Sequence, residues 1–459
     1  FFPLATTGEK ENRRWGYPAL IQPSDKLFAL ITEAGIERWN SASSLHNDRN
    51  KELYRVVMDE NVQNTTGRWT SPWRVIIVGK LEDVVASTLV TDVSEPCRIE
   101  DTSWIKPGSV SWIYWAYNHG SSDYQIIRQY VDMAVDMHWP YVLIDAEWDE
   151  MKNGGSIEDA IRYAHDRGIK PLLWYNSSTA WLKAWGAPGP HERLNAPELR
   201  EREFAWLEKM GVAGVKIDFF AGDKQETMEY CIDLLECAAR HHLLVNFHGA
   251  TIPRGWQRTY PNLMSVEAVY GAEWYNNNAT LTPKAAAHNA TLPFTRNVIG
   301  PMDYTPCTFS DSQHPHITTH AHELALSVLF ESPLLHWADK PESYLAQPRD
   351  VRDFMSALPT TWDETRLLGR YPGEWVVMAR RSGSTWYVTG INGKDTAQTL
   401  SFDTSILPKG RYTLFTDKSG YKGELPANNP EPWSIKTWKG KAPSRVTCQP
   451  RGGFVYVVN

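Results

Sequence analysis

Residues 212–247 read VAGVKIDFFAGDKQETMEYCIDLLECAARHHLLVNF, and this stretch decides the fold. An apolar run at Val212–Ile217 is followed by a polar corner, a longer segment with helical spacing, and a second apolar run at Leu243–Phe247. This alternation is typical of strands and helices that take turns along a parallel sheet. The stretch therefore predicts one βα unit followed by the next strand.

The same alternation of apolar runs and helical segments extends from Trp112 to about Trp337. The other apolar runs are Trp112–Trp115, Tyr141–Ile144, Pro171–Trp174 and Leu263–Val266, with two weaker ones near Asn297–Met302 and Ser332–Trp337. About eight strands in roughly 230 residues fit a TIM-type (β/α)8 barrel, whose usual size is about 250 residues. A doubly wound open sheet is the structural alternative, and we favour the barrel. Ser156 and Asp159 resemble a capping box at a helix start.

The texture changes on both sides of this region. Residues 361–459 contain short β-type segments separated by Gly, Asn, Asp and Pro, which predicts a C-terminal antiparallel β-sandwich. Residues 1–104 also resemble β structure, and we expect them to be the last strands of a larger N-terminal domain plus a linker. The expected catalytic barrel then spans residues 105–360. The chain starts at Phe1 without an initiator Met or a charged leader, which suggests a processed or truncated product.

Composition excludes several classes of function. Lys and Arg number 47 against 54 Asp and Glu, a net charge of −7, which argues against a nucleic-acid or anionic-membrane partner. No apolar stretch is long enough to predict a membrane span. The five Cys show neither zinc-type spacing nor a readable disulfide framework. The 21 Trp and 20 Tyr suit a protein that stacks rings on sugars, although they equally suit large core positions.

Polar residues follow the predicted strands, at the end where a barrel enzyme places its active site. These residues are Asp145, Glu147, Trp148, Asn176, Lys216, Asp218, His248, Glu267 and, six positions further on, Glu273. Paired carboxyl groups in one pocket suit glycosidic bond cleavage, where one protonates the leaving oxygen and the other attacks the sugar or activates water. A single carboxylate at a strand end is more often a cap or an ion-pair partner, but five strands that end this way favour a site.

Several motifs together resemble glycoside hydrolase family 97. They are Ser71-Pro-Trp-Arg-Val-Ile, Tyr141-Val-Leu-Ile-Asp145, Gly214-Val-Lys-Ile-Asp218, Asn246-Phe-His248, Glu267-Ala-Val-Tyr-Gly-Ala-Glu273, Gly300-Pro-Met-Asp-Tyr-Thr-Pro306, Ser332-Pro-Leu334 and Gly452-Gly-Phe454. The resemblance implies a three-part enzyme with an N-terminal β-super-sandwich, a catalytic barrel and a C-terminal β-sandwich. The family's N-terminal domain is much longer than the piece present here.

The resemblance also implies a mechanism. Gly249 stands where the inverting branch of the family has a Glu that acts as the general base, and Asp218 stands where that branch has Gly. This arrangement is similar to the retaining, α-galactosidase-like branch, and implies Asp218 as nucleophile and Glu273 as general acid/base. The two carboxyl groups are then expected about 5 to 5.5 Å apart, against about 6.5 to 9.5 Å for inversion.

The family further implies a Ca²⁺ ion, with Glu33, Glu267 and Glu273 as the matching ligands. We expect Lys216 and His248 to bind sugar hydroxyls or orient a carboxylate, Asp145 and Glu147 to bind hydroxyls, and Trp148 to form a ring platform. Structural roles are the alternative for each: a surface carboxylate for Glu33, a satisfied histidine for His248, and helix capping for the other acids. The histidines at 314, 316, 320 and 322 favour polar helix-start positions over a metal site.

The sequence thus predicts a retaining, exo-acting α-galactosidase that acts on an α-galactoside. The alternatives within the enzyme class are a β-L-arabinopyranosidase and an inverting α-glucosidase. A non-catalytic carbohydrate-binding protein and a calcium-dependent barrel isomerase or lyase are the alternatives from other classes. Because such family members are exported bacterial enzymes, the resemblance also implies a periplasmic or secreted location.

Overall fold

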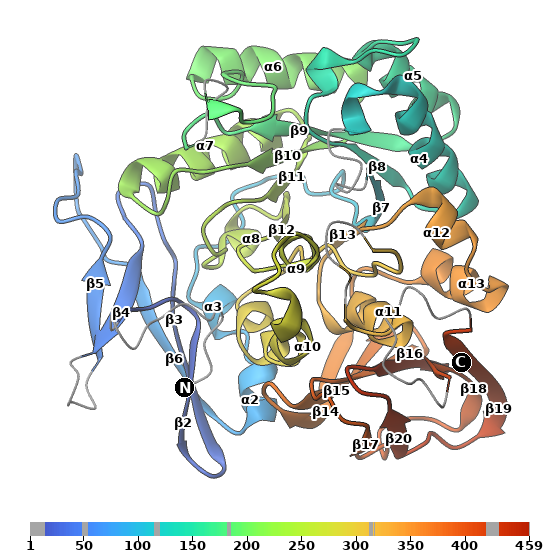
Figure 1. The fold of residues 1–459 in the computed structure, drawn as a ribbon. Helices are drawn as coiled ribbons and strands as arrows, with labels where there is room; N and C mark the ends of the chain where they lie inside the picture. The colour runs from blue at the N-terminus through green and yellow to red at the C-terminus, as the bar shows by residue number, and fades with distance from the viewer. Residues whose placement is uncertain are drawn as a thin grey trace.

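The computed structural model describes residues 14–47, 54–113, 120–180, 185–311, 315, 317–418 and 431–458, and every structural statement below refers to these residues. Figure 1 shows three regions in chain order: small β-sheets near the N-terminus, a central region in which helices surround parallel strands, and a red β-sandwich at the C-terminus. Within these residues no helix is both long and apolar enough to cross a bilayer.

The central region is built on one seven-stranded parallel sheet, in the order β12-β11-β10-β9-β8-β7-β13. Its strands are β7 (Gly108–Trp112), β8 (Tyr141–Ile144), β9 (Lys170–Asn176), β10 (Gly214–Asp218), β11 (Leu244–Phe247), β12 (Leu263–Val266) and β13 (Leu334–Trp337). The last strand pairs with the first, because β13 lies beside β7. The predicted barrel class is therefore confirmed, although the first strand begins four residues earlier than its apolar run and ends at Trp112.

The seventh predicted strand, near Asn297–Met302, is wrong. Residues Arg296–Val298 form a 3-10 turn, and only an isolated parallel bridge between Val266 and Met302 joins this segment to β12. Pro301 has no backbone N–H, so it cannot continue a hydrogen-bonded ladder. The buried guanidinium of Arg296 instead donates to the carbonyl oxygens of Val266, at 2.8 Å, and Pro301, at 3.0 Å.

Helices cover the outside of the sheet (Figure 1). The longer ones are α4 (Tyr124–Asp136), α5 (Ile157–Asp166), α6 (Pro197–Met210), α7 (Gln225–Arg240), α11 (His320–Leu329) and α13 (Arg349–Ala357). The shorter helices are α2 (Leu81–Val85) and α3 (Leu89–Asp92), which pack against β3 and β6 of the N-terminal region, and α8 (Trp256–Thr259), α9 (Ala272–Asn277), α10 (Ala285–Asn289) and α12 (Pro341–Leu345). The predicted capping box is confirmed at α5, where Asp159 Oδ2 accepts from Ser156 N at 2.9 Å and Ser156 Oγ accepts from Asp159 N at 3.3 Å.

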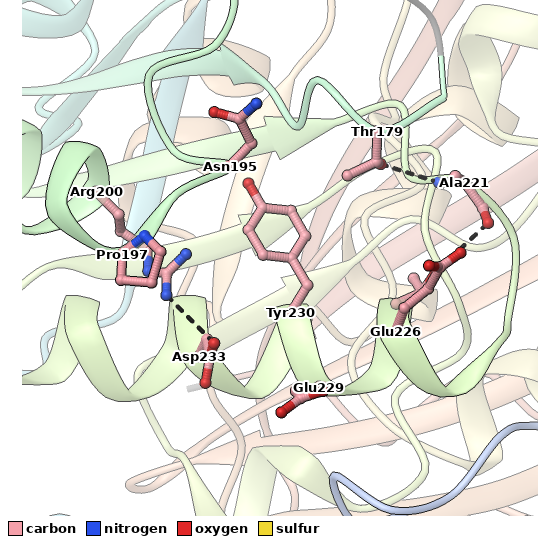
Figure 2. A pocket seen from close by; sticks show the side chains of 10 residues that line it. Thr179, Asn195, Pro197, Arg200, Ala221, Glu226, Glu229, Tyr230 and Asp233 are labelled. Atoms are coloured by element: carbon pink, nitrogen blue, oxygen red, sulfur yellow. Dashed lines mark hydrogen bonds and ion pairs between the residues drawn. The ribbon is translucent and has the colours of Figure 1, made fainter. Parts of the chain in front are cut away.

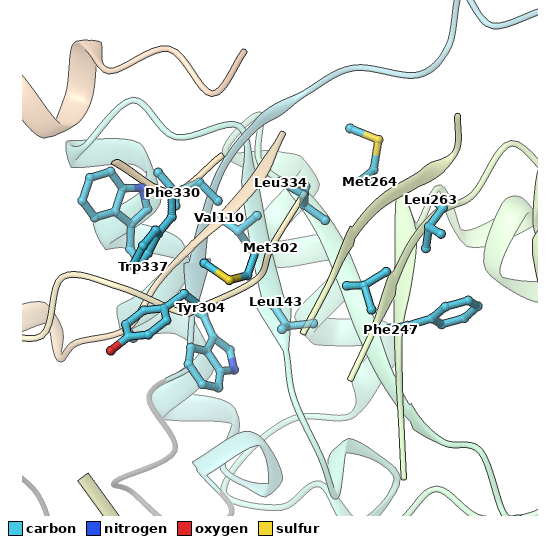
Figure 3. Packing of buried hydrophobic residues seen from close by; sticks show 14 of the residues in the cluster. Val110, Leu143, Phe247, Leu263, Met264, Met302, Tyr304, Phe330, Leu334 and Trp337 are labelled. Carbon is cyan, nitrogen blue, oxygen red and sulfur yellow. The ribbon is translucent and has the colours of Figure 1, made fainter. Parts of the chain in front are cut away.

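Apolar side chains fill the barrel and the spaces beneath its helices. Figure 3 shows Val110 and Leu143 near Met302 and Leu334, and Phe247 beside Leu263, all in one buried cluster. Burial of such a side chain contributes about 1.5 to 3 kcal/mol, so this layer supplies much of the folding free energy. The polar strand-end residues therefore stand on a dry, close-packed base, which limits their movement.

The flanking regions are β structure. The N-terminal strands form two three-stranded sheets, β2-β3-β6 and β1-β4-β5, from β1 (Arg14–Trp15), β2 (Ala19–Ser24), β3 (Leu27–Ala34), β4 (Ser43–Asn47), β5 (Tyr54–Met58) and β6 (Trp73–Gly79). The C-terminal sandwich has a six-stranded sheet, β14-β15-β16-β21-β18-β19, and a pair, β17-β20. Its strands are β14 (Glu364–Tyr371), β15 (Trp375–Ser382), β16 (Thr385–Asn392), β17 (Gln398–Ser401), β18 (Gly410–Asp417), β19 (Trp433–Gly440), β20 (Arg445–Cys448) and β21 (Gly453–Val458).

A buried ion pair joins the N-terminal sheets to the barrel. Glu33 on β3 is fully buried, and its Oε1 accepts from Arg254 Nε at 2.6 Å. Arg254 lies in the loop after β11, and its carbonyl oxygen accepts from Gly35 N at 3.0 Å. The second oxygen of Glu33 faces Arg74 Nη1, at 3.1 Å. The N-terminal strands thus fix the loop that follows a strand of the site.

Replacing Arg254 with methionine is expected to lower the free energy of unfolding by about 3 to 5 kcal/mol, because the buried Glu33 carboxylate then loses its buried arginine partner. Urea denaturation measures the change. Arg74→Met is the matched control, since it removes the more exposed partner of the same carboxylate. Equal losses in the two variants would show that Arg254 has no special part in joining the domains.

Candidate active site

The carboxyl ends of the parallel strands bring the predicted polar residues to one end of the barrel. Asp145 directly follows β8, Asp218 ends β10, and His248 and Glu267 directly follow β11 and β12. Lys216 and Asp218 are two residues apart on β10, so their side chains point to the same side of the sheet. The charges of Asp218 and Glu273 both act on Lys216, which places these groups in one electrostatic environment.

Lys216 is a buried cation beneath this end of the barrel. Its side chain is 4% exposed, its Nζ lies 3.0 Å from Asp145 Oδ2, and the same oxygen accepts from Trp112 Nε1 at 2.7 Å. Burial alone would lower the pKa of Lys216, but the charges of Asp145, Asp218 and Glu273 outweigh it and raise the pKa. Burial would raise the pKa of Asp145, yet the Lys216 cation and its hydrogen bonds lower it. The pair therefore stays ionised.

The Asp218 carboxylate is fixed by two donors. Oδ1 accepts from the backbone N–H of Phe219 at 2.7 Å, and Oδ2 accepts from Trp174 Nε1 at 3.3 Å. Phe219 has a positive φ of 65°, a conformation that side chains other than Gly rarely adopt. Ser177 supports this backbone, because its Oγ donates to the Phe219 carbonyl at 2.7 Å. The two donors to its carboxylate thus hold Asp218 in one orientation.

Gly249 leaves the space that the Asp218 carboxylate occupies. A Cβ at position 249 would lie 2.7 Å from Asp218 Oδ1 and 2.9 Å from Phe219 N, and Gly249 has a φ of 47°. Both distances are below van der Waals contact, and the backbone conformation disfavours any other residue. A longer side chain at 249 and the present position of Asp218 therefore exclude one another.

Gly249→Ala is accordingly expected to displace Asp218 and to lower the turnover of a glycoside substrate roughly 10²-fold. Ala250→Gly, at the adjacent position, is the control for backbone changes in the same loop. Steady-state kinetics with circular dichroism of both variants give the answer. Full turnover by a folded Gly249→Ala protein would contradict the role of this contact.

Two carboxyl groups and an imidazole converge beside Asp218. One ligand atom from each of His248, Glu267 and Glu273 lies within 4.8 Å of the others. Glu267 Oε2 accepts from Gly249 N at 2.8 Å and lies 3.7 Å from His248 Nδ1. Burial raises the pKa of Glu267, and burial with the nearby Glu267 and Asp218 charges raises the pKa of Glu273 to about 7. Burial and their mutual repulsion thus disfavour the ionised form of these two carboxyl groups.

Asp303 is a site residue whose role the sequence did not reveal. Its Oδ2 accepts from His248 Nε2 at 2.7 Å and Asn246 Nδ2 at 2.8 Å, and lies 2.9 Å from His336 Nδ1. Burial would raise the pKa of Asp303, but the two histidines lower it. Asp303 therefore orients His248 so that Nδ1 faces Glu267. It lies in the motif Gly300–Pro306, which was the available signal.

Comparison with known proteins identifies this arrangement. Residues 3–96 match the model "Glycosyl-hydrolase 97 N-terminal", residues 108–269 match "Glycoside hydrolase 97", and residues 361–459 match "Glycosyl-hydrolase 97 C-terminal, oligomerisation". The chain belongs to glycoside hydrolase family 97.

Relatives within family 97 carry names that bear on activity. A "Probable retaining alpha-galactosidase" of Streptomyces bingchenggensis is 37% identical over 83% of this chain and 60% of its own length. A "Retaining alpha-galactosidase" of Bacteroides thetaiotaomicron is 30% identical over 87% of this chain and 65% of its own length. The chain thus spans less than two thirds of the length of each of these relatives. The solved structure of a beta-arabinopyranosidase is 32% identical, with a TM-score of 0.86, over 96% of this chain and 72% of its own.

Two predicted residues of this family 97 chain lie elsewhere. Glu33 does not join the group formed by His248, Glu267 and Glu273, because both of its oxygens are engaged by arginines. Trp148, predicted as a sugar platform, lies in the packed interior. Its indole is 2% exposed, stacks on Trp206 at 6.1 Å and donates to the Trp174 carbonyl at 2.7 Å. An apolar ring after a strand cannot by itself distinguish a platform from a core position.

The remaining predicted residues have mixed outcomes. Glu147 is half-buried with a φ of 66°, and its N–H donates to the Gly189 carbonyl at 2.7 Å, so its backbone shapes the loop after β8. His314 and His316 lie outside the described residues. His322 Nε2 contacts Asn289 Nδ2 at 3.0 Å, and His320 stacks on Phe309 at 4.9 Å. These two described histidines have structural roles.

A separate pocket of about 400 Å³ lies behind the loops after β9 and β10. Figure 2 shows Tyr230 between Thr179 and Arg200, with Arg200 paired to Asp233. No predicted site residue lines this pocket. Tyr230 instead supports the site from behind, because its hydroxyl donates to the Ser177 carbonyl at 3.1 Å.

Proposed function

We propose that this chain contains the catalytic machinery of a retaining, exo-acting α-glycoside hydrolase, and that its substrate is an α-galactoside. The observation that carries the proposal is the position of Asp218 Oδ1 against Gly249. A Cβ at residue 249 would collide with this oxygen, so glycine at 249 leaves room for a carboxylate from β10. A retaining enzyme needs such a carboxylate in contact with the anomeric carbon. The names of the two bacterial relatives support the same activity.

In the proposed first step, an oxygen of Asp218 attacks the anomeric carbon while the bond to the leaving oxygen breaks and Glu273 gives its proton to that oxygen. In the second step water attacks the same carbon, Glu273 takes a proton from the water, and the bond to Asp218 breaks. Burial and the nearby Glu267 and Asp218 charges raise the pKa of Glu273 to about 7, so a large share of this group carries the proton it needs as an acid at neutral pH. A carboxyl separation of about 5 to 5.5 Å is expected for this mechanism.

The buried cation serves both steps. Lys216 places positive charge near Asp218 and Glu273, where the proposed steps move charge. Asp145 holds Lys216 in position, and His248 is held by Asp303. We propose that Lys216, Asp145, Glu147 and His248 bind sugar hydroxyls at the edge of the same space.

A divalent cation fits the group of possible ligand atoms that His248, Glu267 and Glu273 form beside Asp218. Glu267, together with Glu273 in its ionised form, offers the hard oxygen ligands that Ca²⁺ prefers, and further oxygens must complete its six to eight positions. We propose Ca²⁺ here, without Glu33 as a direct ligand. When bound, the ion polarises the sugar hydroxyls and balances the carboxylates.

Chelation of divalent cations is expected to lower the midpoint of thermal unfolding, because a ligand that binds only the folded protein stabilises it. Differential scanning fluorimetry with EGTA and then with added Ca²⁺ measures the change. Glu267→Gln should weaken the response, whereas Glu374→Gln, a surface carboxylate paired with Lys394, should keep it. An unchanged midpoint on adding Ca²⁺ to chelated protein would exclude the site.

The second candidate is a β-L-arabinopyranosidase, which the similarity to a solved enzyme of that name favours. A panel of nitrophenyl α-galactoside, β-L-arabinopyranoside and α-glucoside separates the candidates by their kcat/KM values. Proton NMR of the first sugar released tests the stereochemistry, and β-galactose as the initial product would exclude retention. A carbohydrate-binding protein would release no sugar. The periplasmic or secreted location stays a prediction.

A further inference from the structure

A mixed group of side chains lies on the outer face of α6 and α7, away from the proposed catalytic residues. Glu201 comes from α6, Cys237 comes from α7, and His241 directly follows α7. Cys237 Sγ lies 3.3 Å from Glu201 Oε2, and His241 Nε2 lies 2.9 Å from Glu201 Oε1. One atom from each residue lies within 4.8 Å of the others. We propose that this group is a Zn²⁺ site.

The ligand types favour zinc over the hard cations. Cys237 and His241 are four residues apart, so their side chains share one side of the helix end. Zn²⁺ accepts sulfur, nitrogen and carboxylate oxygen in a tetrahedral arrangement, with metal–ligand bonds of about 2.0 to 2.3 Å. Ligand atoms around such an ion lie roughly 3 to 4 Å from one another, and the contacts of Glu201 with Cys237, at 3.3 Å, and with His241, at 2.9 Å, are close to that spacing. Three protein ligands leave the fourth position for water.

A second observation points to a metal ligand at His241. Its Nδ1 lies 2.8 Å from Glu208 Oε2, so the ring is oriented from behind and Nε2 is directed at the group. Histidines that bind metals usually donate their other ring N–H to a carboxylate in this way. His242 also reaches Glu208, at 3.5 Å, but its side chain is 56% exposed and is not part of the group.

Without a metal, the group is held together by hydrogen bonds and by an ion pair between Glu201 and Arg240. Arg240 Nη2 lies 2.8 Å from Glu201 Oε2, and its hydrogen bond, followed by those of His241 and Cys237, lowers the pKa of Glu201 to about 2. Burial, with Glu201 beside it, raises the pKa of the Cys237 thiol to about 12. Zinc binding therefore replaces the thiol proton with a sulfur–zinc bond, releases that proton to solvent, and competes with Arg240 for the carboxylate.

The position of the group indicates a structural role. One turn earlier on α7, Asp233 pairs with Arg200 of α6 at 3.3 Å, beside the pocket in Figure 2. A zinc ion on Glu201, Cys237 and His241 would add a second link between the same two helices. In the chain, α6 lies between β9 and β10, and α7 follows β10. The link would therefore stabilise the outer layer behind the strand that carries Asp218.

Co²⁺ is the probe, because its thiolate complexes absorb in the near ultraviolet. The titration uses the full chain with Cys97→Ser, which removes the exposed thiol, in excess Ca²⁺ to saturate the centre at Glu267 and Glu273. We expect one equivalent of Co²⁺ with a thiolate charge-transfer band that added Zn²⁺ abolishes. The band should be absent in Cys237→Ser and present in His242→Ala. Its absence from the Cys97→Ser protein, or its persistence in Cys237→Ser, would overturn the proposal and leave an ion-pair group only.

Two surface substitutions keep the test valid if Cys237→Ser does not fold. Glu201→Gln should weaken Co²⁺ binding at least tenfold, whereas Arg240→Gln should strengthen it several-fold by removing the competing guanidinium. A simple ion-pair group predicts no binding in either variant. Hydrolysis of nitrophenyl α-galactoside should persist in every variant of this group, so failure of the zinc site and failure of the proposed catalytic function are distinguishable.

Discussion

Asp218→Gly is expected to lower the turnover of an α-galactoside at least about 10³-fold, because the covalent step loses its nucleophile. Glycine also leaves an open space beside Gly249, where the Asp218 oxygen now lies. A small anion fits that space. Added azide should therefore restore cleavage of an activated nitrophenyl substrate and yield the β-galactosyl azide, whose configuration is inverted.

The folded state of this variant needs its own measurement, since Asp218 also accepts from Trp174 and the Phe219 amide. Asp218→Asn, which keeps the size of the side chain, is the matched variant: it should be inactive and should not respond to azide. A folded Asp218→Gly protein that azide fails to rescue, or one that yields the α-azide, would remove Asp218 from the nucleophile's role.

Glu273→Gln is expected to produce a loss that depends on the leaving group. A natural galactoside needs a proton from the acid, so its kcat/KM should fall roughly 10² to 10⁴-fold. A dinitrophenyl galactoside departs without that proton and should lose far less in its first step. Azide should accelerate the second step of the variant, where no base is left to activate water.

The pH profile provides the second measurement for Glu273. Its raised pKa means that the acid is protonated below about 7 and ionised above it, so the kcat/KM of the unmodified protein should fall as pH rises through about 7. Glu273→Gln should lose this alkaline limb. Glu95→Gln, an exposed carboxylate near the linker, is the control. A limb that persists in Glu273→Gln would belong to another group.

The sequence was most informative where a hydrophobic pattern or a motif is compatible with only one local structure. Apolar runs that end in Asp145, Asp218 and Glu267 predicted parallel strands, and parallel strands place their ends together. The family resemblance also singled out Gly249. The structure adds the physical reason, because any side chain at 249 would collide with the carboxylate of Asp218.

The misplaced residues had no local signal. Glu33 reads as any carboxylate on a strand, and its partner Arg254 lies more than two hundred residues away in the chain. Trp148 belongs to a layer of aromatic rings that only tertiary packing reveals. Asn297–Met302 has the hydrophobicity of a strand, yet Pro301 and the Arg296 guanidinium replace the ladder there. Asp303 gained its role through two distant histidines.

The single bridge between Val266 and Met302 has a consequence for dynamics. Elsewhere around the barrel, opening the wall breaks several backbone hydrogen bonds at once, whereas here the backbone is held by Asp303 N to the Val266 carbonyl, at 3.0 Å, and by the Arg296 side chain. Amide hydrogen exchange at Asp303 should therefore be faster than on β10. Since Asp303 and Glu267 lie on the two sides of this junction, we expect the proposed sugar site to open there more readily than at β10, the strand that carries Asp218.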